Sequence, residues 1–219
     1  MPNSTANNTI AIIFTIFIIQ HFIKDIEFFV TKETLHITLS RERLSKTQVD
    51  ELVSQLENEP DLAPFLFQMI LLEDKEGTFN AAWTFDHLMR KKLQNLLPFF
   101  ETFADRLSEL KTESCIRPLA HVCEMVCEAY FKKKDPLFIQ NITDEQLEKI
   151  LTCCFDWLIG PMNMAPKVFS MTSLYYLGLK FPWVHPELKQ VLEDTYGSGT
   201  MGYKNRAKKT LDKLAKLGI

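Results

Sequence analysis

Apolar residues recur at helical spacing from about residue 45 to the C-terminus. Two of these stripes each follow a capping box, a four-residue motif that starts a helix. The side chains of its first and fourth residues accept hydrogen bonds from backbone amides that have no partner within the helix. The two boxes are Ser45–Gln48 and Thr143–Gln146. The stripe behind the first box is Val49, Leu52, Val53 and Leu56. This spacing predicts a helix over residues 46–57.

The later stripes are separated by short turns, which predicts helices that fold back on one another in pairs. The chain has only seven glycines, so few positions suit the tight turns of β-hairpins or phosphate-binding loops. We therefore expect an all-α fold of about four antiparallel helix pairs. The expected helices after the first span about 62–72, 79–92, 96–110, 116–130, 144–158, 168–177, 186–196 and 203–219.

The first forty residues differ in composition from the rest of the chain. Residues 1–40 contain nine Ile and two Leu, whereas residues 41–219 contain seven Ile and twenty-six Leu, which predicts an atypical extension (1–40) before a helical repeat domain (41–219). The apolar run from Ile10 is shorter than a membrane-spanning helix, and no basic residue precedes it as in a signal peptide. The alternation in Thr34–Leu39 favours a strand. A further hypothesis is that this extension is loosely ordered or is translated from a non-native upstream start.

The charge and cysteine content of the chain argue against several classes of protein. The chain has 25 Lys and Arg against 28 Asp and Glu, a formal charge of -3, which argues against whole-protein attraction to nucleic acid or anionic lipid. Its five cysteines are odd in number and two of them are adjacent, unlike a disulfide framework. We expect a cytoplasmic protein that does not associate with membranes.

The repeated helix pairs resemble HEAT and armadillo α-solenoid repeats, from about residue 45 to the C-terminus. Ala165–Gly178 carries the closest likeness, a second helix with Lys167 at its start, apolar residues within it and a closing Leu-Gly. Arg117 and Arg206 occupy the equivalent cationic position, 50 residues before and 39 residues after Lys167. The first pair departs from the pattern, because Asn80 replaces the cation and the expected turn aspartate is clear only at Asp74. The resemblance implies an architecture and no activity.

Two short motifs suggest other functions. Gly197–Gly202 matches the dinucleotide-binding G-x-G-x-x-G, but a helix precedes it where a strand is required, so we interpret it as an interhelix loop. Gly160–Lys167 faintly resembles the signature loop of the fumarase and adenylosuccinate lyase superfamily, without its serine pair or closing Asn-Pro. A lyase-related protein is therefore a second alternative function.

We find no catalytic or metal-binding constellation and expect neither an enzyme nor a cofactor. His121 lies about 200° from Cys123 around a helix, so His121, Cys123 and Cys127 cannot share one metal ion. His87 and His185 have no acid or nucleophile at a recognisable spacing. The three tryptophans, Trp83, Trp157 and Trp183, have apolar neighbours, which favours core positions.

The most plausible function from the sequence is a non-catalytic adaptor that presents an extended helical surface to a protein partner. The alternative is a DNA-binding or DNA alkylation repair-type HEAT-like protein, because the resemblance extends to repair glycosylases of that architecture, with nucleic acid bound through the basic C-terminal helix. Charge placement distinguishes the two: unpaired cations along one face favour nucleic acid, whereas cations paired with carboxylates argue against it. The candidate interaction residues are Arg117, Lys167, Lys204, Arg206, Lys208 and Lys209.

Overall fold

The computed structural model describes residues 30–72 and 77–219, and residues 31–219 form one compact unit. Eleven α-helices and no strand occur in these described ranges, which confirms the predicted all-α class. The predictions for the apolar run from Ile10 and for Asp74 lie outside the described residues. The helices are α2 (Lys32–Leu39), α3 (Lys46–Leu56), α4 (Ala63–Leu71), α5 (Thr78–Lys91), α6 (Phe100–Arg106), α7 (Glu113–Cys127), α8 (Pro136–Asn141), α9 (Asp144–Ile159), α10 (Met164–Leu177), α11 (Val184–Tyr196) and α12 (Met201–Lys216).

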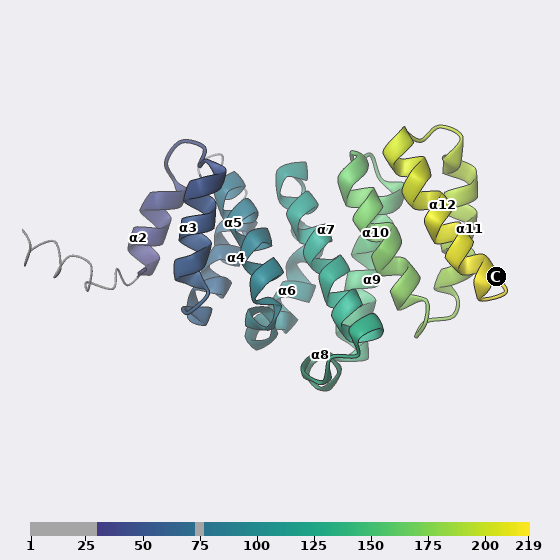
Figure 1. Ribbon diagram of the computed structural model, residues 1–219, viewed down its shortest axis with the longest axis horizontal. Coiled ribbons are helices and arrows are strands. Elements are labelled where there is room, and N and C mark those ends of the chain that lie inside the picture. Colours follow the sequence, from purple (N-terminus) through teal and green to yellow (C-terminus); the bar gives the residue numbers. More distant parts are fainter. Residues whose placement is uncertain (1–29, 73–76) are drawn as a thin grey trace, which may run out of the picture. The chain divides into compact units, whose positions relative to one another are not determined.

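The helices stack as consecutive pairs (Figure 1). The second helices pack directly on one another, α5 on α7, α7 on α10 and α10 on α12, while α3 adds to this layer by packing on α5. The first helices α4, α9 and α11 each pack on the second helix of their own pair, and α6 contacts α9. The pairs α4–α5, α9–α10 and α11–α12 thus bury one face between their two helices and another against a neighbouring pair, as stacked repeats do.

Both predicted capping boxes start helices as expected. Ser45 and Gln48 exchange side-chain and backbone hydrogen bonds at the start of α3, and Thr143 and Gln146 do so at α9. The strand expected over 34–39 is wrong, because these residues belong to α2. Leu35 and Leu39 are fully buried one helical turn apart, so the apparent alternation contains an i, i+4 pair that favours a helix in the folded chain.

Two helix boundaries near prolines differ from the predicted ones. The expected helix over 96–110 is divided into a 3₁₀ segment (Leu93–Phe99), α6 and a further 3₁₀ turn (Leu107–Glu109). Pro98 has no amide hydrogen and its ring disfavours a continuous α-helix at this point. Pro186 does not open α11, which begins two residues earlier at Val184. The short helix α8 was not predicted, although Asp135 caps it through the amide of Leu137.

A cluster of phenylalanine rings forms the core between α4, α5 and α6. Phe67 lies at its centre, with its ring centroid 6.0 Å from that of Phe85 and 5.4 Å from that of Phe103. All three side chains are at most 1 % exposed. In the ranges that the structure describes, no helix combines the length and the apolar composition needed to cross a membrane.

Candidate interaction surfaces

A recess on the layer of second helices contains a buried carboxylate. This Asp86 recess has a volume of about 570 Å³ and is formed by α5, α7 and α10, with Trp83, Asp86 and Arg90 from α5, Arg117 and His121 from α7, and Phe169 from α10. Asp86 Oδ1 lies 2.5 Å from His121 Nδ1, and Asp86 Oδ2 accepts a hydrogen bond from Arg90 at 2.5 Å. Both carboxylate oxygens are therefore satisfied, so the interaction mainly fixes α5 against α7.

The structure gives the histidines partners that the sequence did not reveal. His87 Nδ1 lies 3.4 Å from Asp50 Oδ1, and its Nε2 accepts a hydrogen bond from the Trp83 indole at 3.0 Å. The imidazole of His185 bonds the carbonyl oxygen of Tyr175 at 2.8 Å. No local spacing indicated the acid beside His87, because Asp50 reaches it from another helix.

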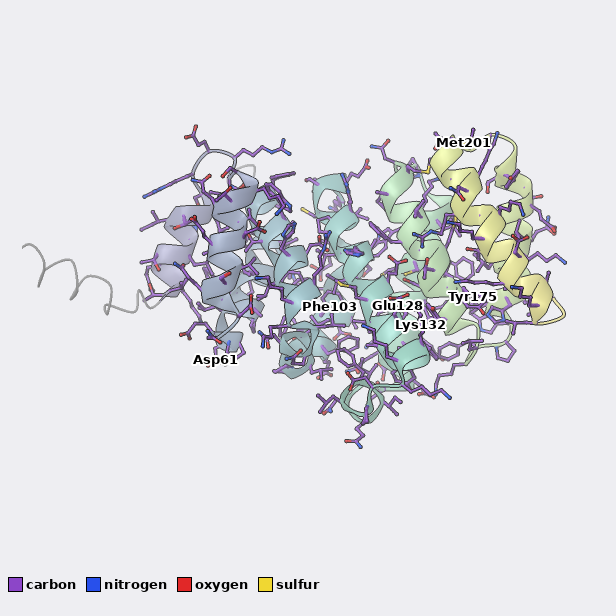
Figure 2. The ribbon with its side chains drawn as sticks, in the orientation of Figure 1. Asp61, Phe103, Glu128, Lys132, Tyr175 and Met201 are labelled. Atoms are coloured by element: carbon purple, nitrogen blue, oxygen red, sulfur yellow. The ribbon has the colours of Figure 1, made fainter. Side chains whose placement is uncertain are left out.

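A second surface, the cation groove, lies between α10 and α12. It has a volume of about 390 Å³, and its cations are Arg206, Lys209, Lys213 and Lys216, set beside Tyr175. Lys213 Nζ lies 4.9 Å from the centroid of the Tyr175 ring. Partial burial, followed by the neighbouring Lys132 and Arg206 charges, lowers the pKa of Lys213. Figure 2 labels Tyr175 on α10, and Glu128 and Lys132 on the π-helical turn Glu128–Lys133. This turn contacts α10.

The six cations singled out in the sequence occupy different settings. Arg117 is exposed in the Asp86 recess, and Lys167 is half-buried in the first turn of α10. Arg206 donates to Glu124 Oε1 at 2.9 Å and also bonds Thr172, so it connects α12 to α7 and α10. The remaining residues lie on α12: Lys209 lines the cation groove, Lys208 pairs with Asp212 at 3.0 Å, and Lys204 is half-buried.

A third surface lies on the other layer, between α9 and α11. This Trp183 groove has a volume of about 510 Å³ and apolar walls of Phe155, Ile159, Trp183 and Val191. The Phe155 and Trp183 rings stack with centroids 5.9 Å apart and an interplanar angle of 16°. Trp183 is 56 % exposed and Ile159 is 62 % exposed, so the predicted core position of Trp183 is wrong. The signal for this groove was a second apolar stripe, Leu151, Phe155 and Ile159, at i, i+4 spacing on α9.

Carboxylates border the Trp183 groove. Asp156 and Glu187 line it, and neither forms an ion pair with a cation in the part of the chain that the structure describes. Exposed aromatic and aliphatic side chains with unpaired charges at their edge are features of protein-binding surfaces. The groove is therefore suited to an apolar side chain that is accompanied by a positive charge.

The cysteines belong to the core. All five are buried, and burial raises the pKa of the Cys123 thiol, which also lies beside Cys154. Within residues 30–72 and 77–219, no group of three or more His, Cys, Asp or Glu side chains is arranged to hold a metal ion. His121 instead bonds Asp86 and packs against Phe169, with ring centroids 4.6 Å apart.

Comparison with known proteins identifies one family. The family model of a HEAT repeat domain matches residues 36–214, which is most of the chain. No curated protein and no solved structure matched the chain at a significant level. The match runs from within α2 to within α12, so it covers the Asp86 recess from Arg43 onward, the Trp183 groove and all of the cation groove except Lys216.

Proposed function

This chain belongs to the HEAT repeat family, and from that premise we propose that it is a non-catalytic adaptor that binds a protein partner through the Trp183 groove. The observation that carries the proposal is the Phe155–Trp183 stack, in which Trp183 is 56 % exposed and Phe155 is half-buried beneath it. Large aromatic side chains that remain accessible on a folded protein are the residues that contribute most to binding at protein interfaces. Burying Trp183 and Ile159 against a partner would remove their apolar surface from water.

The composition of the groove also specifies the chemistry of the partner. Its floor is apolar, while Asp156 and Glu187 add negative charge at its edge. A partner segment with an aliphatic or aromatic anchor next to Lys or Arg would satisfy both features. Helices α9 and α11 present most of the groove, with Trp183 at the N-cap of α11, and this regular secondary structure limits the entropy lost on binding.

Pairing with carboxylates argues against nucleic-acid binding through two of the candidate cations, Arg206 and Lys208. Arg206 and Lys208 are paired with Glu124 and Asp212, so two of the six candidate cations are already neutralised by carboxylates. Counterion release needs cations that are free to neutralise phosphates.

The proposal is tested by affinity capture from a nuclease-treated lysate of the native cells. The test variant is Trp183→Ser combined with Ile159→Asp, and the matched control is Met201→Ser, because Met201 is 82 % exposed and does not line the groove. Wild-type protein and the control should retain the same partner, and the double variant should lose it. For the purified partner, losing a central aromatic contact should weaken the Kd by about thirtyfold.

Two results would count against the proposal. The first is equal capture of the partner by the wild-type protein and the double variant, which would show that another surface binds it. The second is loss of all captured material after nuclease treatment, which would show that nucleic acid mediates the capture. Circular dichroism of each variant checks that the helices are intact, as expected for substitutions at exposed positions.

A further inference from the structure

The cation groove between α10 and α12 has a concentration of positive charge that the proposed function does not use. Arg206, Lys209, Lys213 and Lys216 follow one another on α12 at spacings of three, four and three residues, so they share one face of the helix. At a rise of about 1.5 Å per residue, this row is about 15 Å long. Four cations therefore surround a single recess of about 390 Å³.

Most of this charge is not neutralised within the protein. In the portion of the chain covered by the structure, Lys209, Lys213 and Lys216 form no ion pair, whereas Asp212, the acidic residue of the recess, is paired with Lys208. Lys213 is held over the Tyr175 ring, and its pKa is lowered first by burial and then by the charges of Lys132 and Arg206, against the opposing effect of Glu128 and Glu124. An anion in the groove would relieve this repulsion among like charges.

One cation of the groove is already held in place. The Arg206 guanidinium is fixed by Glu124 on α7 and by the Thr172 hydroxyl on α10, so its remaining N–H donors are held in place. Glu124 offsets its charge, while Lys209, Lys213 and Lys216 supply the charge of the groove that is unpaired among the described residues. Arginine and lysine together provide several charge-assisted hydrogen-bond donors around one site. A phosphomonoester, with a charge of about -1.5 to -2 and three acceptor oxygens, matches this arrangement.

We propose that the cation groove binds a phosphorylated serine or threonine side chain of the protein partner. This proposal rests on the proposed adaptor function, because it assumes that the phosphoryl group is carried by a protein partner. Nucleic acid is the less suitable ligand because its phosphates extend well beyond a row of about 15 Å. Glu124, Glu128 and Asp212 lie beside the row and would repel a longer polyanion.

The test measures binding of fluorescent peptides to the purified full chain. One mixture has a central phosphoserine flanked by randomised residues, a second has serine in its place, and a third probe is a 20-nucleotide single-stranded DNA. The phosphorylated mixture should bind about tenfold more tightly than the serine mixture, since charge-assisted hydrogen bonds are the stronger class. Inorganic phosphate at high concentration should compete, and added salt should weaken binding.

Substitutions on α12 test whether the phosphopeptides bind in the cation groove. Lys213→Met should reduce phosphopeptide affinity by about tenfold, and Lys213→Arg should restore most of it because the charge returns. Lys204→Met is the matched control, since Lys204 lies on the same helix and does not line the groove, so its effect should stay within about twofold.

Three results would overturn the proposal: equal binding of the two peptide mixtures, unchanged phosphopeptide binding by Lys213→Met, or tighter binding of the DNA than of the phosphopeptides. Failure of the adaptor function gives a different result: in the affinity-capture experiment, the wild-type protein would retain no protein partner, whereas the phosphopeptide measurement would be unaffected. The Trp183→Ser variant should bind phosphopeptides as the wild-type protein does, since Trp183 lines another groove.

Discussion

Asn80 and Leu44 are joined by a buried hydrogen bond in which the Leu44 amide donates to Asn80 Oδ1 at 3.0 Å. The Asn80 amide nitrogen donates in turn to the carbonyl oxygen of Leu39 at 2.9 Å. One side chain on α5 thereby fixes the connection between α2 and α3. Asn80 occupies the position where the HEAT-like pattern has a cation, and a neutral amide suits it because it both accepts from and donates to the backbone there.

Asn80→Ala should lower the free energy of unfolding by about 2 to 3 kcal/mol, because it leaves a buried amide and a buried carbonyl without partners. Urea denaturation measures the change. Asn205→Ala, at an exposed position on α12, should remain within about 0.5 kcal/mol of the wild-type protein. Equal stability of the two variants would show that the Asn80 hydrogen bonds contribute little.

Gly178→Ala should destabilise the turn between α10 and α11. A Cβ atom at Gly178 would lie 2.0 Å from Cδ2 of the buried His185 ring, which would have to move away from the Tyr175 carbonyl oxygen. We expect a loss of about 1 to 3 kcal/mol, typical of overpacked sites. Gly197→Ala is the control, because nothing lies within 4 Å of its Cβ position. Thermal melting should show a lower Tm for the first variant alone.

The ion pair between Arg206 and Glu124 should stabilise the stack more than the one between Lys208 and Asp212. The first joins α12 to α7 and its carboxylate is 12 % exposed, whereas the second lies within α12 and is well exposed. Double-mutant cycles to alanine should give a coupling energy of about 1 to 2 kcal/mol for the first pair. The second should give less than about 0.5 kcal/mol, and a larger value for it would contradict this ranking.

The cysteine thiols should be unreactive in the folded protein. Burial raises the pKa of Cys153 to about 12 and raises those of Cys123 and Cys127 as well. Because the thiolate is the nucleophile, alkylation of Cys153 by iodoacetamide at pH 8 should be slower than that of an unfolded thiol by roughly a thousandfold. Mass spectrometry should find five modified cysteines after unfolding in guanidinium chloride, and rapid labelling before unfolding would contradict the assigned burial.

Because the same thiols are buried, we expect the free energy of unfolding to decrease in alkaline solution. An unfolded thiol ionises at a pKa of about 8.5, whereas the buried thiols of the folded chain keep their protons to higher pH. The unfolded state then binds fewer protons than the folded state, so the free energy of unfolding falls as pH rises above about 8.5. For Cys153, the loss of stability begins at the unfolded pKa of about 8.5 and continues until the pH reaches the folded pKa of about 12. Cys123→Ala should show a shallower decline in urea titrations.

Local sequence signals predicted the helices well because caps and apolar stripes act within a few residues. The Ser45–Gln48 and Thr143–Gln146 boxes place the starts of α3 and α9, and each needs only four consecutive residues. Residues 34–39 were predicted incorrectly because a short apolar pattern is compatible with either a strand or a helix until other helices cover it.

The surfaces required the packed stack, because their residues are distant in sequence. Asp86 and His121 are 35 residues apart and Arg206 and Glu124 are 82 apart, and no local pattern pairs them. Trp183 has apolar neighbours in the sequence, yet it is exposed because α9 and α11 pack through their other faces. Periodicity predicts which residues of a helix share a face, whereas the packing between pairs determines which faces remain open to a partner.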